Sequence, residues 1–453
     1  MGPPCKSLGP VTIISEGPFR RPSAGKRRGR REQRAPLQEG GGSAAVDQEE
    51  TSQPEGEGER RARRNALVLA IAQGLYFIGA TVLISLGALT GHLLAQDKSL
   101  ATLPVTTYVL GTLVATIPAS HMMRHLGRRT GFQIGALFAV AGTSLAVHAI
   151  FERAFWLFCA ATLLLGAYQA CAQYYRFAAA DTASEAFKPK AISWVLAGGL
   201  VAALIAPQIV IYTKDAFAPV LFAGSFAAAG VAALLAIGVL AFLDIPRLPA
   251  QQAGGRQSRP LLEILRQPRL RIAILTGMVS YASMTFVMTA TPLAMVACNH
   301  SVDSATLAIQ WHVVAMFAPS FFTGHLIARL GREMVILTGL LMLGAAGLVA
   351  LSGLSAVHFT LALVLLGVGW NFGYIGSTTM VTDCHRPEER NKVQALNEFM
   401  VFSLVASASF ASGYVLHNRG WEVVAFVYLP FVALAAGLVL MLHLGARRSI
   451  AAG

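Results

Sequence analysis

The sequence is poor in charged residues and has no cysteine pattern. Only 13% of its 453 residues are Asp, Glu, Lys or Arg, about half the share of a soluble domain. The five cysteines are far apart, with no CxxC and no Cys/His metal spacing, so they indicate neither a disulfide framework nor a zinc site. There is no Ser/His/Asp order, HExxH motif or phosphate-binding loop. We therefore expect no enzyme, no catalytic residue, no metal and no cofactor.

Apolar residues, in contrast, make up 55% of the chain, although the formal net charge is +13. The mean hydropathy is +0.56. This combination excludes a disordered chain. It also argues against a nucleic-acid partner, because no basic face is carried on a compact polar domain. The position of the positive charge along the chain therefore becomes informative.

Residues 1–64 differ from the rest of the chain. They are rich in Gly, Pro, Arg, Gln and Glu, and their 13 basic and 9 acidic residues leave a net charge of +4. This composition predicts a disordered cytoplasmic tail. A contact of its basic run with anionic lipid or nucleic acid remains an alternative to a simple solvated tail.

The remaining residues form a series of apolar stretches that are each long enough to cross a lipid bilayer. Twelve such stretches are present, at about residues 66–90, 99–123, 131–150, 154–180, 191–212, 217–243, 272–297, 305–328, 333–352, 357–381, 393–416 and 421–444. Soluble proteins do not use so many apolar helices with such short loops. The sequence thus predicts an all-α membrane protein with twelve transmembrane helices.

Lysine and arginine alternate between the loops on the two sides of these spans. From Arg60 onward, 22 of the 27 basic residues fall on one side, four fall on the other (Lys98, Arg153, Lys214 and Arg419), and Arg176 lies inside a span. The positive-inside rule places the richer side in the cytoplasm. We expect a multi-pass protein of the cell inner membrane (plasma membrane) with both termini cytoplasmic.

The spans divide into two halves that repeat each other. Residues 244–271 have the composition of a linker and separate an N-terminal six-helix bundle, 65–243, from a C-terminal one, 272–453. The loop after span two reads SHMMRHLGRR (120–129) and the loop after span eight reads GHLIARLGR (324–332), an offset of 204. Asp181 and Asp383, each followed nine residues later by a lysine, repeat with an offset of 202. We infer a parallel internal duplication.

This organisation resembles the major facilitator superfamily, whose signature in these loops is roughly G-x-L-x-D-R-x-G-R-R. The first copy has Ser120 and Arg124 in place of the signature's Gly and Asp, and the second has Ala328 in place of the Asp. Residues 369–376 and 386–399 resemble a bacterial permease branch whose substrates are poorly characterised. The resemblance implies two six-helix bundles that rock about a central site.

The loop arginines are candidate gating residues. Arg128 and Arg332 can pair with Asp181 and Asp383 at neighbouring helix ends, which would hold one conformation of the rocking bundles. The alternative, that these arginines only set the topology, stays open.

In the family that this chain resembles, spans one, four, seven and ten line the cavity, and here these spans carry polar faces. Polar groups inside a bilayer usually face the protein interior or a water-filled cavity. The candidate substrate-binding residues are Gln73, Tyr76, Gln169, Gln173, Tyr281, Trp370, Asn371 and Tyr374. Hydrogen bonding between packed helices is the alternative, favoured for Thr276, Ser280 and Gln208.

Arg176 and Glu398 are charged residues inside spans, each about one turn from the cytoplasmic side. Equal depth in opposite halves lets them meet across a cytoplasmic gate, where protonation of Glu398 would weaken the pair. They are therefore candidate gating and coupling residues. The alternative is that each pairs within its own half.

The function that these features favour is secondary active transport of a small organic solute by alternating access. No ATP-binding segment is present, so an ion or solute gradient supplies the energy, with protons as the candidate coupling ion. Amides, hydroxyls and aromatic rings suit a neutral or heterocyclic metabolite or vitamin, and uptake by symport is favoured. Efflux by proton antiport and a transport-dead sensor or scaffold remain alternatives. We expect a monomer whose partners are the small-molecule substrate and the lipid bilayer.

Overall fold

The computed structural model of the chain describes residues 57–184, 187–245, 259–386 and 389–451, and every regular element in these ranges is helical. The N-terminal half contains α1 (Glu57–Leu94), η1 (Lys98–Leu100), α2 (Leu103–Leu126), α3 (Arg128–Phe151), α4 (Phe155–Ala172), α5 (Tyr175–Asp181), α6 (Lys188–Thr213) and α7 (Ala223–Leu240). The C-terminal half contains α8 (Leu261–Leu265), α9 (Pro268–Ala297), α10 (Val302–Phe317), α11 (Ser320–Leu330), α12 (Arg332–Ser352), α13 (Ala356–Thr382), α14 (Arg390–Arg419), α15 (Trp421–Val427) and α16 (Leu429–Ala451).

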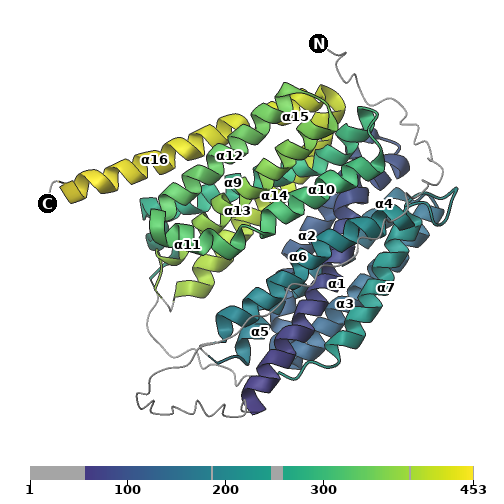
Figure 1. Cartoon of the computed structure of the whole chain (residues 1–453), viewed down its shortest axis with the longest axis horizontal. Coiled ribbons are helices and arrows are strands. Elements are labelled where there is room, and N and C mark those ends of the chain that lie inside the picture. Colours follow the sequence, from purple (N-terminus) through teal and green to yellow (C-terminus); the bar gives the residue numbers. More distant parts are fainter. Residues whose placement is uncertain (1–56, 185–186, 246–258, 387–388, 452–453) are drawn as a thin grey trace, which may run out of the picture.

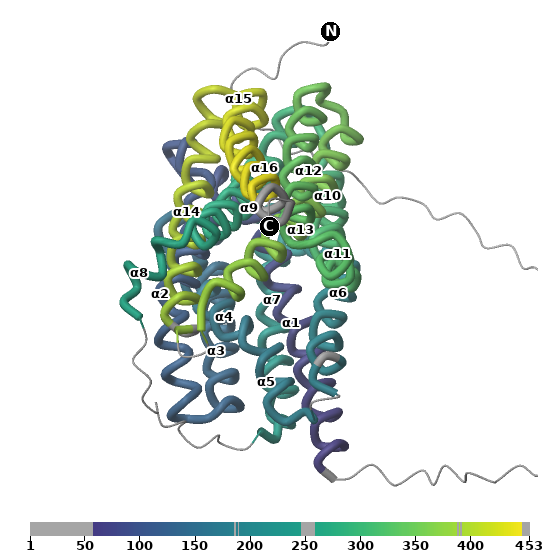
Figure 2. Tube along the Cα trace, turned by 90° about the vertical axis from the view of Figure 1, so that its left-hand side faces the viewer, coloured from purple at the N-terminus to yellow at the C-terminus, as the bar shows by residue number. Residues whose placement is uncertain are grey.

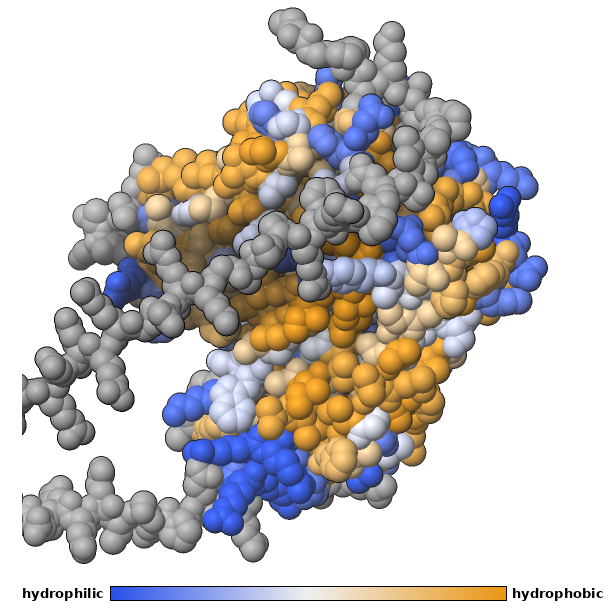
Figure 3. All heavy atoms as spheres, turned by 45° about the vertical axis from the view of Figure 1, so that its right-hand side comes forward, coloured by the Kyte–Doolittle hydropathy of each residue, from blue (hydrophilic) through white to orange (hydrophobic). Residues whose placement is uncertain are grey.

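Twelve spans result from these helices. Eleven helical segments are long and apolar enough to cross a membrane, and the bent pair α10 and α11 makes the twelfth. Each of the twelve stretches predicted from the sequence overlaps one of them, so the predicted fold class is confirmed. Figure 3 shows a wide apolar surface with hydrophilic residues gathered toward its two ends, as a bilayer-spanning protein requires.

Two boundaries differ from the predicted ones. Helix α1 begins at Glu57, so the predicted tail, 1–64, ends too late. The Arg63 side chain lies 3.1 Å from the Glu59 carboxylate, an i,i+4 pair that stabilises this first part of the helix. The predicted linker, 244–271, contains α8 and the start of α9. Residues 1–56 and 246–258 lie outside the described residues.

The helices form two bundles, α1 to α7 and α9 to α16, that lie side by side (Figure 1). Figure 2 shows the short helix α8 at the outer edge of the molecule. We call the end of the spans that carries Arg128 and Arg332 the arginine-rich end, and the end that carries Lys98 and Lys214 the arginine-poor end. In Figure 1 the two bundles converge toward the arginine-poor end, at the right, and diverge toward the other.

Polar contacts between the bundles are found in the half of the molecule nearer the arginine-poor end. Where both partners are described, they are Thr106 Oγ1 to Ser409 Oγ at 3.2 Å, Gln208 Nε2 to Gln310 Oε1 at 3.4 Å, and Lys214 Nζ to Asp303 Oδ1 at 3.3 Å. At the arginine-rich end, the ion pairs between described residues connect elements of one bundle, or the linker to a bundle. The bundles are therefore held together at the arginine-poor end.

Cysteine and acidic side chains form no metal centre within the described ranges, since no three His, Cys, Asp or Glu side chains converge there. Cys159, Cys171 and Cys384 are buried free thiols.

Candidate functional site

Aromatic side chains gather on the face of the C-terminal bundle that meets the other bundle. We call them the aromatic cluster: Tyr281 of α9, Phe317 of α10, Trp370 and Tyr374 of α13, and Phe402 of α14. Trp370 and Tyr374 are four residues apart on one helical face, and their rings stack with centroids 5.4 Å apart and planes at 19°. The Tyr281 ring meets both edge-on, at 5.4 and 5.0 Å.

The cluster also holds an unused hydrogen-bond donor. Trp370 is 8% exposed, and its indole Nε1 has no hydrogen-bond partner among the described residues. A buried indole N–H usually finds a partner. Stacked rings with a free donor suit a planar heteroaromatic solute that accepts a hydrogen bond at its edge.

The aromatic cluster reaches across to the N-terminal bundle. The Phe317 ring meets Phe77 of α1 edge-to-face, with centroids 5.2 Å apart. Tyr281 lies within electrostatic range of Tyr76 and Tyr108 of the N-terminal bundle. Because Phe77 lies midway along α1, the two bundles meet near the middle of the membrane, where transporters of this architecture bind substrate.

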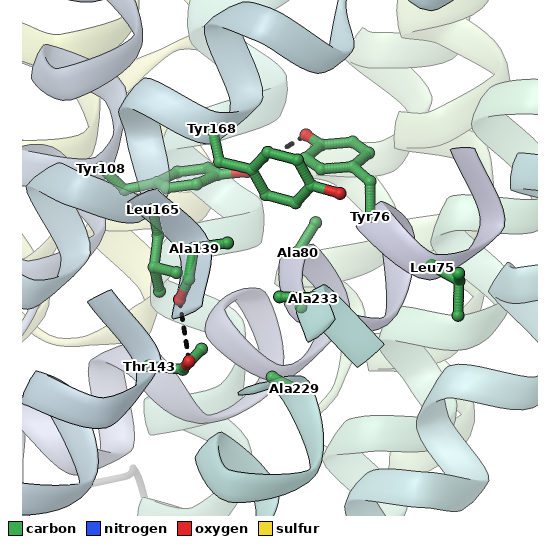
Figure 4. Close-up of a pocket in the computed structure, with 11 residues that line it drawn as sticks. Leu75, Tyr76, Ala80, Tyr108, Ala139, Thr143, Leu165, Tyr168, Ala229 and Ala233 are labelled. Carbon is green, nitrogen blue, oxygen red and sulfur yellow. Dashed lines mark hydrogen bonds between the residues drawn. The ribbon is translucent and has the colours of Figure 1, made fainter. Parts of the chain in front are cut away.

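A second set of aromatic side chains lies inside the N-terminal bundle (Figure 4). The hydroxyls of Tyr76 and Tyr108 are 3.2 Å apart, and the Tyr168 ring meets Tyr76 edge-on at 5.4 Å. Beside them is a cavity of about 20 Å³, which is enough for one water molecule. The Tyr168 hydroxyl makes no hydrogen bond within 3.5 Å to any of the described residues. This cavity suits a bound water rather than an organic solute, so the interface between the bundles is the better candidate for the substrate site.

Arg176 and Glu398 lie beside the aromatic cluster. Both are within electrostatic range of Tyr281 and Tyr374, and of each other. The Arg176 guanidinium lies 4.9 Å from the centre of the Phe177 ring, and no ion pair within 4.0 Å joins it to Glu398. The two charges therefore approach from opposite bundles without contact. Their pairing in a state closed at the arginine-rich end stays a prediction.

Asn371 does not face the site, contrary to the prediction. It is fully buried, its Nδ2 donates to the Met316 carbonyl and to Ser320 Oγ, both at 2.7 Å, and its Oδ1 accepts from Thr323 Oγ1 at 2.6 Å. Both amide hydrogens are used inside the C-terminal bundle. The periodicity placed Asn371 on a polar face of α13, but α10 and α11 cover that part of the helix.

The three predicted glutamines are only partly brought together. Span four breaks between α4 and α5, where the Tyr174 N–H donates to the Cys171 carbonyl. Gln169 and Arg176 lie on either side of this one-turn interruption, but the segment Phe155–Asp181 forms a single candidate span, so the common polar face of Gln169, Gln173 and Arg176 stays a prediction. Gln169 accepts a hydrogen bond from Thr112 of α2 at 2.7 Å, so it has the helix-packing role kept as an alternative.

Gln73 and Gln173 keep some exposure. Gln173 is half-buried at the end of α4, and Gln73 is half-buried against Gly199 of α6. Their amides remain candidates for contact with a solute. Thr276 bonds Ser377 across α9 and α13 at 2.8 Å, the helix-to-helix contact that the sequence favoured.

Both anticipated arginine–aspartate ion pairs are present at the arginine-rich end. Arg128 approaches Asp181 with N–O distances of 3.0 and 3.1 Å, and Arg332 approaches Asp383 at 2.9 Å. Each pair joins the ends of two helices of its own bundle. Their role in gating stays a prediction.

A buried ion pair that the sequence did not suggest ties the linker to the C-terminal bundle. Arg259 binds the Glu389 carboxylate at 2.7 and 2.8 Å, and the Arg386 N–H donates to the same carboxylate at 3.0 Å. The Glu389 side chain is 1% exposed. The hydrogen bonds from Arg259 and the Arg386 backbone lower the pKa of Glu389 to about 2. Sequence spacing gave no signal, because the partners are 130 residues apart.

The sequence analysis also missed Phe77, Phe317 and Phe402. A phenylalanine within an apolar span looks the same whether it faces lipid, a neighbouring helix or a substrate path. Only a count of aromatic residues near the middle of spans one, eight and eleven could have pointed to them.

Comparison with known proteins agrees with this architecture. A sequence model of the Major Facilitator Superfamily matches residues 69–293 and 273–451. The chain is 49% identical over 374 residues to the riboflavin transporter RfnT of Brucella anthropi, covering 82% of this chain and 94% of that protein. It is 28% identical over 363 residues to the uncharacterized MFS-type transporter YddS of Bacillus subtilis, covering 75% and 82%.

Solved structures share the fold at low sequence identity. The nucleoside transporter NupG superposes with a TM-score of 0.61 at 14% identity, over 83% of this chain and 99% of that one. The xylose transporter XylE from E. coli gives a TM-score of 0.65 at 15% identity, over 84% and 98%.

Proposed function

The chain belongs to the major facilitator superfamily, and we propose that it carries riboflavin into the cell by alternating access. The observation that carries this proposal is the 49% identity, over 94% of its length, to a protein named as a riboflavin transporter. Efflux and a transport-dead scaffold have no comparable support. The predicted solute class, a heterocyclic vitamin, includes riboflavin.

The chemistry of the site supports a flavin. Riboflavin combines a planar three-ring system with a chain of hydroxyls, and the ring carries acceptor oxygens and nitrogens at its edge. The stacked rings of Trp370 and Tyr374 offer aromatic faces, and the free Trp370 Nε1 offers a donor. Gln73 and Gln173 are suitable partners for the hydroxyl chain. Arg176 and Glu398 together add no net charge, which suits a neutral solute.

The orientation of the protein in the membrane follows from the distribution of its basic residues. We place the arginine-rich end in the cytoplasm, because the basic residues of the core are concentrated there. Both termini are then cytoplasmic in an inner membrane, and the structure corresponds to a state closed toward the outside. A single chain contains both bundles, so a monomer suffices for transport.

Proton coupling is assigned to Glu398. It lies beside the aromatic cluster, near Arg176 of the other bundle. A closed cytoplasmic gate would bring the two charges into contact, and protonation of Glu398 would weaken that contact and favour opening. Arg128 with Asp181, and Arg332 with Asp383, would hold the loops at the same end.

Direct transport tests the proposal. The purified full-length chain in liposomes should accumulate riboflavin, and the chain should support growth of a bacterium that can neither make nor import riboflavin. Binding to the detergent-purified protein should quench flavin fluorescence. Absence of riboflavin binding and uptake by a folded protein would refute the proposal.

A tryptophan pair gives a matched control for the site. Trp370→Ala should weaken riboflavin binding by about fivefold or more, because stacking on an aromatic side chain contributes ~1–3 kcal/mol. Trp156→Ala should leave binding unchanged, since Trp156 is 69% exposed on α4 and lies outside the aromatic cluster. Equal effects of the two variants on riboflavin binding would show that Trp370 is not part of the binding site.

A further inference from the structure

Span eight is broken near the middle of its length. Helices α10 and α11 meet at an angle of 43°, and the break falls at Ala318 and Pro319. Proline has no N–H to continue the helical hydrogen bonds. A break at this depth leaves backbone carbonyls without their helical partners, which is costly in a bilayer unless a neighbouring helix supplies new ones.

The neighbouring helix α13 supplies them through one side chain. Asn371 donates to the Met316 carbonyl on the α10 side of the break and to Ser320 Oγ on the α11 side, and it accepts from Thr323 one turn further on. The carbonyl of Met316 would be paired with the N–H of Ser320 in an unbroken helix. The amide of Asn371 thus joins both sides of the bend.

We call these hydrogen bonds of Asn371 to Met316, Ser320 and Thr323 the Asn371 staple. The residues next to the staple belong to the aromatic cluster. Phe317 ends α10, directly beside the break, and Trp370 precedes Asn371 in α13. Their rings lie 6.3 Å apart, and the Phe317 ring also meets Phe77 of the other bundle at 5.2 Å. Any change in the bend would displace Phe317 relative to both rings.

We propose that Asn371 is a positioning residue that sets substrate affinity by holding the bend of span eight, and with it Phe317 and Trp370, in the geometry of the aromatic cluster. It does this without touching the solute, since its amide hydrogens are used inside the bundle. This inference rests on the proposed function for its effect on riboflavin, but the staple itself does not depend on the identity of the solute.

Substitutions of the two hydroxyls that contact the Asn371 amide test the proposal without leaving a large cavity in the core. Thr323→Val removes, at nearly constant volume, the hydroxyl that lies 2.6 Å from Asn371 Oδ1 and 2.8 Å from the Pro319 carbonyl, and Ser320→Ala removes the acceptor of Asn371 Nδ2. Each should raise the riboflavin dissociation constant and KM by about three- to tenfold, as the loss of one hydrogen bond implies, with kcat within about twofold of wild type. Thr323→Ser keeps the hydroxyl and should restore wild-type values. Thr338→Val is the matched control, because its hydroxyl bonds only the Met334 carbonyl of its own helix.

Hydrogen exchange provides a readout that needs no substrate. Amides in residues 316–323 should exchange faster in Thr323→Val and Asn371→Asp than in the wild type, while exchange in α12 stays unchanged. Wild-type exchange and wild-type riboflavin affinity in Thr323→Val would overturn the positioning role. If the wild type binds no riboflavin, the proposed function fails, and the exchange measurement still decides whether Asn371 holds the bend.

Discussion

Replacing Gly413 by alanine should separate the two bundles at the arginine-poor end. Gly413 is buried on α14, and a Cβ at this position would lie 2.2 Å from Thr102 Oγ1 and 2.8 Å from its Cγ2. Ordinary contacts between heavy atoms lie near 3.5–4.0 Å. Thr102 is itself 1% exposed and β-branched, so its side chain has little room to turn away. The contact is relieved only if α14 moves away from Thr102 by about 1 Å or more.

The size of the expected shift from the closed to the open conformation follows from the cost of overpacking. An extra methyl in a well-packed contact costs ~1–3 kcal/mol, and here the cost falls on the conformation that is closed at the arginine-poor end. The gain in helix propensity from glycine to alanine, ~1 kcal/mol, is common to both conformations and cancels. The ratio of closed to open states should therefore fall by about 5- to 150-fold, and transport should slow because every cycle passes through the closed state.

Accessibility of Ser409 measures this shift. Ser409 is fully buried between the bundles, where it bonds Thr106 of α2. In a variant whose native cysteines are replaced, Ser409→Cys should react with a membrane-impermeant maleimide at least about fivefold faster when Gly413→Ala is added. Thr102→Ala should reverse much of the change. Gly437→Ala is the matched control, because a Cβ there meets no atom within 4 Å. Labelling within twofold of the parent would refute the argument.

Three further predictions concern charged groups. Glu398→Gln should abolish the pH dependence of riboflavin transport in liposomes, and unchanged pH dependence would exclude this carboxyl as the coupling site. Glu389→Gln should lower the melting temperature of the purified protein by several degrees, because it leaves the half-buried Arg259 without its ionic partner. Since the folded pKa of Glu389 is about 2, below its ordinary value of 4.5, the stabilisation is present above pH 4.5 and is lost as the pH falls toward 2. The wild type should lose thermal stability in that range and Glu389→Gln should not. Arg128→Gln and Asp181→Asn should each alter the transport rate, with a double variant no worse than either single one; additive effects would show that the ion pair does not act as a unit.

Features that depend on local chemistry could be predicted from the sequence. Each span is a continuous apolar segment, and the energetic cost of leaving polar backbone in a bilayer acts on each segment separately. The duplication was visible because the Gly-Arg loops and the aspartates repeat at offsets of 204 and 202 residues. The ion pairs Arg128–Asp181 and Arg332–Asp383 then follow, since each joins the ends of neighbouring helices.

The composition of the site depended on contacts that helical periodicity does not contain. Periodicity identified a polar face on α13, but could not tell that α10 and α11 would cover Asn371 while Trp370 and Tyr374 met Tyr281. It did not show that a one-turn interruption at Gln173 and Tyr174 divides span four into α4 and α5. It had no way to pair Arg259 with Glu389.

The sequence by itself therefore determined the number of spans, the two-bundle repeat and the charge difference between the two ends, because bilayer insertion is decided segment by segment. The tertiary structure alone decided which side chains meet between the bundles. Whether a polar group binds a solute or a neighbouring helix depends on which surfaces lie opposite it, and those surfaces come from distant parts of the chain.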